Sequence, residues 1–159
     1  MASRDLADLH PVLRVLAQQH IDICAASGVR LLIYCTWRSP DEQAALYAQG
    51  RRPLHAVNAL RKAVGLSAIT DGENRRRVTN ARTSRHSYML DGAPAALAYD
   101  CCPLDDAGRP DWSGEGYRWQ LVAEIGKRLG LRWGGRWKTP RDRPHFEIPE
   151  PQATEVVES

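Results

Sequence analysis

One short run of β-branched and aromatic residues, from Val29 to Trp37, most constrains the fold of this chain. Its centre is fully apolar, which is typical of a buried strand. Helix signals enclose the run on both sides, because Gly28 ends a helix expected over 5–27 and Ser39-Pro40 begins a helix that runs to about Ala48. The sequence therefore predicts a buried strand between two helices.

Two of the expected helices have an apolar face. In the helix over 5–27, this face follows an i, i+3, i+4 spacing and comprises Val12, Val15, Leu16, Gln19, Ile23 and Ala26. In a helix expected over 116–129, it comprises Tyr117, Leu121, Ile125 and Leu129. Further strands are expected over 95–102, 131–133 and 144–148, and a short helix or a loop over 61–69. Because helices and strands mix without regular β-α-β alternation, we predict an α+β fold.

The composition is that of a globular protein. The 159 residues are 43% hydrophobic and 26% charged, which suits one domain with a core over about 5–148 and an acidic tail over 149–159. The apolar runs are only a few residues long, as at Leu31-Leu32-Ile33, and the N-terminus lacks the apolar segment of a secretory signal. We therefore expect a single domain over 1–159 without stable membrane insertion.

The charges argue against nucleic acid as a partner. Lys and Arg number 22 against 19 Asp and Glu, a formal net charge of +3. This excess is too small to indicate a nucleic-acid-binding protein by itself. A local basic run, Arg75-Arg76-Arg77, is interpreted as a solvated face.

The four cysteines point to a structural role. The sequence contains no C-x-x-C pair, so a zinc finger or a thioredoxin-type site is disfavoured. Adjacent Cys101 and Cys102 would point to opposite faces of a strand, which disfavours a bond between them. We expect small buried thiols, with a Cys24–Cys35 disulfide as the open alternative.

The remaining ring side chains are interpreted as structural. Three histidines lack acidic or histidine partners at a useful spacing, namely His10, His20 and His55. Three tryptophans are expected in the core, with a sugar-binding platform as the alternative: Trp119, Trp133 and Trp137.

Two other histidines lie near acidic residues in a pattern that suits metal chemistry. Ser84-Arg85-His86 is followed by Asp100, and Asp142 precedes His145 by three residues. Imidazole nitrogens and carboxylate oxygens are ligands that zinc accepts, and a catalytic zinc site keeps one position for water. His86, Asp100 and His145 would supply three ligands, and Asp142 would be placed to take a proton from that water. On the residues alone, a structural role for the histidines stays open.

Several motifs occur together in one order along the chain. They are Cys35-Thr36-Trp37-Arg38-Ser39-Pro40-Asp41-Glu42-Gln43, then Ser84-x-His86…Asp100, then Trp133-Gly134-Gly135-x-Trp137…Asp142-Arg143-Pro144-His145-Phe146-Glu147. In this order and spacing, the chain from about Asp5 to Ile148 resembles the zinc peptidases of the D-Ala-D-Ala carboxypeptidase/VanX group, family M15. Within that group it is most similar to the phage L-alanyl-D-glutamate endopeptidases, which are endolysins. The resemblance implies a small antiparallel sheet flanked by helices, as in hedgehog and DD-peptidase domains.

The resemblance also implies roles for the acidic and histidine residues. His86, Asp100 and His145 correspond to the three zinc ligands of the family. Asp142 corresponds to the acidic residue that acts as general base. Glu147 would follow His145 on the same face of a strand, where it can orient that histidine.

The resemblance also implies roles for three polar residues, two of which flank the helix start at Ser39-Pro40. Arg38 corresponds to the arginine that stabilises the oxyanion in the family. Ser84 and Gln43 are expected to bind substrate, and Gln43 is also expected to brace Arg38. A surface ion pair of Arg38 with Asp41 or Glu42 is the alternative.

Two departures from the family pattern bear on these assignments. Thirteen residues, Ser87 to Tyr99, separate His86 from the next ligand, where the family commonly has six. Asp91 therefore competes with Asp100, although Asp91-Gly92 is typical of a turn and Asp100 lies in a predicted strand. The acidic residue at 142 is Asp rather than Glu, which within the family favours the L-Ala-D-Glu bond.

The resemblance implies a zinc-dependent peptidoglycan endopeptidase that cleaves the L-Ala-D-Glu bond of stem peptides during host-cell lysis. Mn or Co could substitute for zinc. We expect a monomer that is made in the host cytoplasm and reaches the periplasm and cell wall at lysis, and its mildly basic surface favours approach to an anionic wall. The alternatives are a D-Ala-D-Ala carboxypeptidase or dipeptidase, and a non-catalytic zinc-stabilised module that binds the cell wall.

Overall fold

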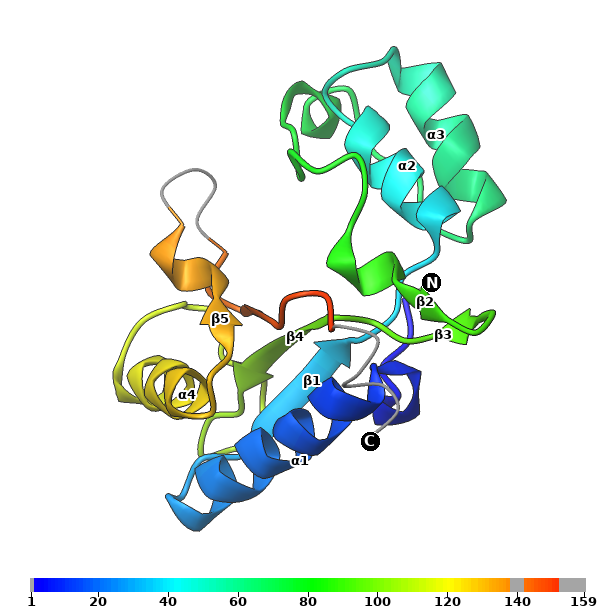
Figure 1. The fold of residues 1–159 in the computed structure, drawn as a ribbon. Helices are drawn as coiled ribbons and strands as arrows, with labels where there is room; N and C mark the ends of the chain where they lie inside the picture. Colours follow the sequence, from blue (N-terminus) through cyan, green and yellow to red (C-terminus); the bar gives the residue numbers. More distant parts are fainter. Residues whose placement is uncertain (1, 138–141, 152–159) are drawn as a thin grey trace.

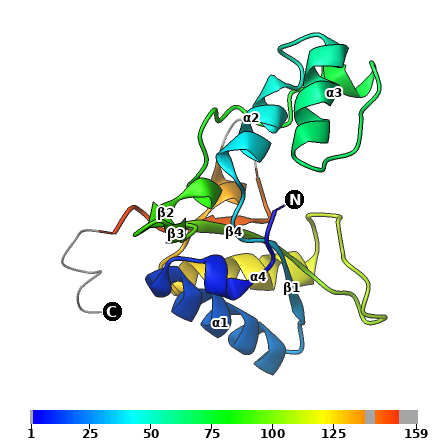
Figure 2. The ribbon, with the colours of Figure 1, turned by 90° about the vertical axis from the view of Figure 1, so that its right-hand side faces the viewer.

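The computed structural model describes residues 2–137 and 142–151. Its centre is a four-stranded antiparallel sheet in the order β1-β4-β6-β5 (Figure 1). The strands are β1 (Leu31–Cys35), β4 (Ala98–Pro103), β5 (Arg132–Trp133) and β6 (His145–Glu147). Helices α1 (Pro11–Ala26) and α4 (Tyr117–Arg128) lie together on one face of this sheet (Figures 1 and 2). This arrangement of a small antiparallel sheet and helices confirms the predicted α+β fold.

A helical lobe, residues 40–83, projects from the sheet beyond the end of β1 (Figure 1). It contains α2 (Pro40–Ala48) and α3 (Leu54–Ala63), which pack against each other, and the 3₁₀ turn η2 (Glu73–Arg75). Ser39 caps α2 as predicted, because its side chain accepts a hydrogen bond from the Glu42 amide at 3.1 Å. Of the two alternatives for 61–69, the loop is closer to the structure, because α3 ends at Ala63 and a turn and loop follow. The helix over 54–63 was not predicted, since α3 buries only Val57 and so has little apolar periodicity to reveal it.

The remaining elements are short. They are η1 (Leu6–Asp8), η3 (Arg85–Ser87), η4 (Gly134–Arg136) and the two-stranded hairpin of β2 (Met89–Leu90) and β3 (Ala93–Pro94). Within the part of the chain that the structure describes, no helix has the length and apolar character needed to cross a membrane.

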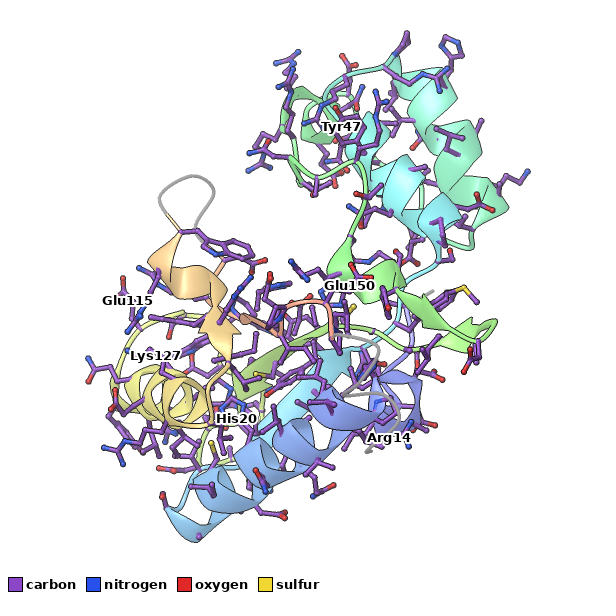
Figure 3. The ribbon with its side chains drawn as sticks, in the orientation of Figure 1. Arg14, His20, Tyr47, Glu115, Lys127 and Glu150 are labelled. Atoms are coloured by element: carbon purple, nitrogen blue, oxygen red, sulfur yellow. The ribbon has the colours of Figure 1, made fainter. Side chains whose placement is uncertain are left out.

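The buried face of α1 differs from the predicted one. Its buried residues are Leu13, Ala17, His20 and Cys24. Val15 and Ile23, which were expected in the core, are 58% and 42% exposed. The prediction was wrong for Val15 and Ile23, whereas Val12 and Leu16 do pack against the core. His20 (labelled in Figure 3) is buried because both of its ring nitrogens have hydrogen-bond partners on neighbouring elements. Nδ1 is hydrogen-bonded to the Tyr99 hydroxyl at 2.6 Å, and Nε2 to the Val122 carbonyl at 2.9 Å.

The prediction for α4 was correct in part. Ile125 is buried, but the other buried residues are Trp119, Val122, Ala123 and Gly126. Gly126 is required here because a Cβ at this position would overlap the Phe146 ring of β6. The close approach of α4 to β6 therefore fixes which face of the helix is buried.

The four cysteines are buried, as predicted, and their thiols are free. The tryptophans divide between core and surface. Trp119 is 5% exposed and Trp133 packs against the core, in agreement with the core interpretation. Trp137 is 39% exposed, so the core interpretation is wrong for this residue.

Candidate metal and catalytic site

The candidate ligands come from three elements that meet at the two inner strands of the sheet, β4 and β6. Asp100 on β4 and His145 on β6 are direct partners across the antiparallel pair, so their side chains lie next to each other on one face. His86 lies in η3, which ends the connection from the lobe. The Ser84 hydroxyl caps this turn by accepting a hydrogen bond from the His86 amide at 3.1 Å.

His86 and His145 each place one ring nitrogen close to the same carboxylate oxygen of Asp100. His86 Nε2 lies 3.4 Å and His145 Nδ1 lies 3.2 Å from Asp100 Oδ1. The two imidazole centroids are 5.3 Å apart. A tetrahedral ion with bonds of about 2.0–2.1 Å separates its ligand atoms by roughly 3.3 Å. The spacing of these donor atoms around Asp100 therefore suits a zinc ion.

Outer hydrogen bonds turn the correct nitrogen of each histidine toward Asp100. His86 Nδ1 is 2.8 Å from the Thr36 carbonyl, to which it donates, so Nε2 carries the lone pair. His145 Nε2 is 2.8 Å from Glu147 Oε1, which leaves the Nδ1 lone pair facing Asp100. Both imidazoles are thus held in the tautomer that a metal requires. The role expected for Glu147 in orienting His145 agrees with this contact.

Glu147 is itself fixed by a third residue. The carboxylate is 7% exposed, and its Oε2 is 2.6 Å from Arg85 Nε. Arg85 also donates to the Ile148 carbonyl at 3.1 Å. The sequence predicted the contact between Glu147 and His145. It did not predict the ion pair between Arg85 and Glu147, because Arg85 approaches β6 only through the tertiary fold.

The charges of the cluster stabilise one another without a metal. Burial opposes protonation of His86, but the adjacent Asp100 carboxylate outweighs it and raises the pKa of His86 to about 10. Burial likewise acts to raise the pKa of Asp100, but His86 and His145 together lower it far below its usual value. A metal ion would take the place of the proton between these groups.

Asp142 lies at the open side of the cluster. Its Oδ2 is 3.9 Å from His145 Nδ1, and its side chain is 42% exposed. One donor atom each from Asp100, Asp142 and His145 lies within 4.8 Å of the others. Burial, followed by repulsion from Asp100, raises the pKa of Asp142. These features suit a group that accepts a proton rather than one that stays permanently ionised.

Gly134 allows the segment carrying Asp142 to approach β6. The Asp142 amide donates to the Gly134 carbonyl at 3.0 Å. A Cβ at position 134 would overlap the Asp142 carbonyl oxygen and lie 3.0 Å from His145 Cβ. Trp133 holds the same segment, since its Nε1 donates to the Arg143 carbonyl at 2.7 Å. The Trp-Gly-Gly motif is therefore part of the site's framework.

Arg38 lies across the pocket from this segment. Its NH1 donates to Gln43 Oε1 at 3.0 Å, so Gln43 braces Arg38 as predicted. Its Nε is 3.3 Å from Glu42 Oε2, so the alternative ion pair with Glu42 is also present. Gln43 in turn donates to the Ala81 carbonyl at 2.8 Å. Together these contacts hold the Arg38 guanidinium at the junction of sheet and lobe.

An open pocket of about 470 Å³ lies between the sheet and the lobe. It is lined by all seven residues that the sequence singled out for the site: Arg38, Gln43, Ser84, His86, Asp100, Asp142 and His145. The competing ligand Asp91 instead lies exposed in the turn of the β2-β3 hairpin, with φ of 51°. Trp137 also lines the pocket, with its ring 5.0 Å from that of His145, and only its place in the Trp-Gly-Gly-x-Trp motif could have indicated this.

Known proteins resemble this chain in sequence and in fold. Residues 77–148 match the family model described as D-alanyl-D-alanine carboxypeptidase, of peptidase family M15. The peptidoglycan L-alanyl-D-glutamate endopeptidase CwlK of Bacillus subtilis (strain 168) is 31% identical over 149 residues, which cover 89% of this chain and 74% of CwlK. The L-Ala D-Glu endopeptidase ChiX of Serratia marcescens shares the fold, with a TM-score of 0.53 at 20% identity over 94% of this chain and 89% of ChiX. This chain therefore belongs to the M15 family of peptidases.

Proposed function

We propose that this protein is a zinc-dependent endopeptidase that hydrolyses the L-Ala-D-Glu bond of peptidoglycan stem peptides. The observation that carries the proposal is the approach of His86 Nε2 and His145 Nδ1 to the same Asp100 carboxylate oxygen, with Asp142 beside them in an open pocket. The similarity to CwlK supports the choice of this bond.

The donor set fits zinc in number, kind and orientation. His86, Asp100 and His145 would hold the ion through two neutral imidazoles and one carboxylate, a combination found in catalytic zinc sites that leave one position open. When bound, zinc would supply Lewis acidity that lowers the pKa of a water molecule and polarises the substrate carbonyl.

Asp142 would transfer the proton. The carboxylate would accept it from the attacking water and deliver it to the amine nitrogen as the C–N bond breaks. The products are then a new carboxylate and a new amino terminus. The raised pKa and partial exposure of Asp142 support both halves of this role.

Arg38 would stabilise the negative charge that develops on the carbonyl oxygen. Gln43 and Glu42 hold the guanidinium in place, so little reorganisation is needed when the charge forms. A donor placed in this way is typically worth about 3–4 kcal/mol of transition-state stabilisation. Ser84 and Gln43 line the same pocket and would contact the substrate.

Digestion of purified muropeptides followed by mass spectrometry tests the proposal. New amino-terminal D-Glu ends are the expected products. Release of free D-Ala would instead favour a D-Ala-D-Ala carboxypeptidase, which is the second candidate because the matched family model carries that description. Binding of zinc and wall fragments without cleavage would favour a non-catalytic binding module.

Several expectations about the biological setting stay predictions. A phage origin, a role in host-cell lysis and passage from the host cytoplasm to the cell wall follow from the resemblance alone, and a single domain over 1–159 follows from length and composition. Action as a monomer is a prediction as well. A lysis assay with outer-membrane-permeabilised cells would test the lytic role, and the size of the protein in solution would test the monomer.

A further inference from the structure

The positive charge of this protein is concentrated in the helical lobe. Residues 40–83 contain eight Lys and Arg against four Asp and Glu, a net charge of +4. The rest of the chain contains 14 against 15, a net charge of −1. The mild overall charge of +3 therefore conceals a basic lobe beside a nearly neutral body.

Six of the lobe's basic residues are arginines that contacts join into one strip. We call this set the arginine strip: Arg51, Arg52, Arg75, Arg76, Arg77 and Arg82. Five of them are exposed and Arg51 is half-buried. Among residues 2–137 and 142–151, no carboxylate forms an ion pair with any member of the strip.

The outer end of the strip is held in place by backbone contacts. Asn74 accepts a hydrogen bond from the Gly50 amide at 3.0 Å and donates to the Arg52 carbonyl at 3.0 Å. Arg77 packs against the same turn, since a Cβ at position 50 would lie 2.8 Å from Arg77 Cγ. These contacts hold the backbone of the triple arginine run beside Arg52.

The inner end of the strip reaches a pocket that adjoins the candidate active site. The Arg51 guanidinium lies 3.8 Å from the centre of the Tyr47 ring, and the Arg82 guanidinium lies 5.5 Å from the same ring (Tyr47 is labelled in Figure 3). Arg82 lines a second pocket of about 590 Å³, and this pocket shares Gln43 and Ser84 with the candidate catalytic pocket. The strip therefore extends from η2 to the pocket that adjoins the candidate site.

We propose that the arginine strip is a docking surface for the anionic peptidoglycan strand that carries the scissile peptide. This proposal rests on the proposed function. Stem peptides carry free carboxylates, and the planar guanidinium pairs with carboxylates through two parallel hydrogen bonds. A strip that ends at the pocket can hold neighbouring stem peptides of one strand while another occupies the site. This continuity with the pocket favours the wall polymer over a nucleic acid.

The test uses the triple variant Arg75→Gln, Arg76→Gln, Arg77→Gln. These residues do not line either pocket, and Gln keeps the methylene groups that pack against Gly50. A control triple variant, Lys62→Gln, Arg109→Gln, Arg128→Gln, removes the same charge from exposed positions outside the strip. Binding is measured by co-sedimentation with purified sacculi stripped of teichoic polymers, in an Asp142→Ala background that does not require cleavage.

The strip variant should bind sacculi about five- to tenfold more weakly than its parent at low salt, and the difference should shrink at high salt. With Asp142 restored, its KM for sacculi should rise, whereas kcat/KM for a single soluble stem peptide should not change. The control triple variant should behave as its parent in both assays.

Equal weakening by the two triple variants would overturn the proposal, since charge alone would then explain the binding. Unchanged binding by the strip variant would overturn it as well, as would strip-dependent retention of duplex DNA without strip-dependent retention of sacculi. Failure of the proposed function has a different signature, namely intact soluble stem peptides in the presence of wild-type protein loaded with zinc.

Discussion

The sheet and the lobe, which lie on either side of the active-site pocket, are built in different ways. On the sheet side, His86, Glu147 and His145 are at most 7% exposed, and each makes a hydrogen bond or ion pair of 2.8 Å or less. On the lobe side, Arg82 and the triple arginine run are exposed. The sheet side is suited to hold reacting groups at fixed positions, and the lobe side is suited to bind a large substrate. Chemistry and access can therefore be disturbed separately, and four experiments test this separation.

The largest effect is expected for Asp142→Ala. Removal of a general base costs about 10²- to 10⁴-fold in kcat. Zinc should stay bound, because Asp142 lies outside the His86, Asp100 and His145 set. Steady-state kinetics on a soluble stem peptide together with zinc content measure both results. Unchanged kcat in the zinc-loaded variant would exclude Asp142 from proton transfer.

The next largest effect is expected for His20, in the core beneath the sheet. Its burial should make the free energy of unfolding depend on pH. Burial lowers the pKa of His20 from 6.5 to about 4 in the folded protein, although the hydrogen bond to Val122 opposes this shift. The folded state therefore binds this proton less readily than the unfolded state. His20 therefore contributes about 3 kcal/mol to the free energy of unfolding above pH 6.5, and this contribution is lost as the pH falls toward 4.

Urea unfolding at pH 7.5 and pH 4.5 measures this dependence. In His20→Gln the corresponding part of the pH dependence should disappear, even though the variant is less stable than wild type at pH 7.5. His55→Gln is the matched control, because His55 is exposed on the lobe and should leave the pH dependence unchanged. The same loss of stability between the two pH values in wild type and His20→Gln would show that another group causes it.

A smaller effect is expected when the outer bond to His145 is weakened. Glu147→Gln keeps the shape of the side chain but removes its charge, so both the bond to His145 and the ion pair with Arg85 are weakened. Changes of this kind typically cost about 10- to 100-fold in metal affinity. Competition with a chromophoric chelator measures the affinity for zinc. An affinity within twofold of wild type would mean that Glu147 does not orient the ligand.

The smallest effects are expected on the free energy of unfolding when one glycine from the sheet side and one from the lobe are replaced by alanine. Gly126→Ala would force a methyl group into the Phe146 ring and should lower the free energy of unfolding by about 1–3 kcal/mol. Gly50→Ala should cost about 1 kcal/mol or more, because Gly50 has φ of 78° and a methyl group there would also lie 3.0 Å from the Arg77 backbone nitrogen. Hydrogen exchange should place the Gly50→Ala effect in the lobe alone. Loosening of the sheet by Gly50→Ala would contradict the separation of the two regions.

The sequence revealed the features that depend on local chemistry. The Ser39-Pro40 start of α2, the glycine-rich turn after Trp133 and the brace of Gln43 on Arg38 each involve residues that lie close in the chain. The order of the motifs and the family resemblance also indicated the ligand set, and the structure brings Asp100, not Asp91, to the two histidines.

The features that the sequence did not reveal depend on tertiary contacts. The buried face of α1 is set by His20, whose two hydrogen bonds reach β4 and α4. Arg85 meets Glu147 only because η3 lies beside β6. The path from the triple arginine run to the pocket passes through Gly50 and Tyr47, which no linear pattern connects.

Zinc content of the purified protein is the most direct test of the account. Wild-type protein dialysed against trace zinc should retain one equivalent per chain. His145→Ala should retain far less while keeping its fold, as judged by circular dichroism. Little or no zinc in a folded wild-type protein, or equal zinc in the folded His145→Ala variant, would contradict the claim that these side chains form a metal site.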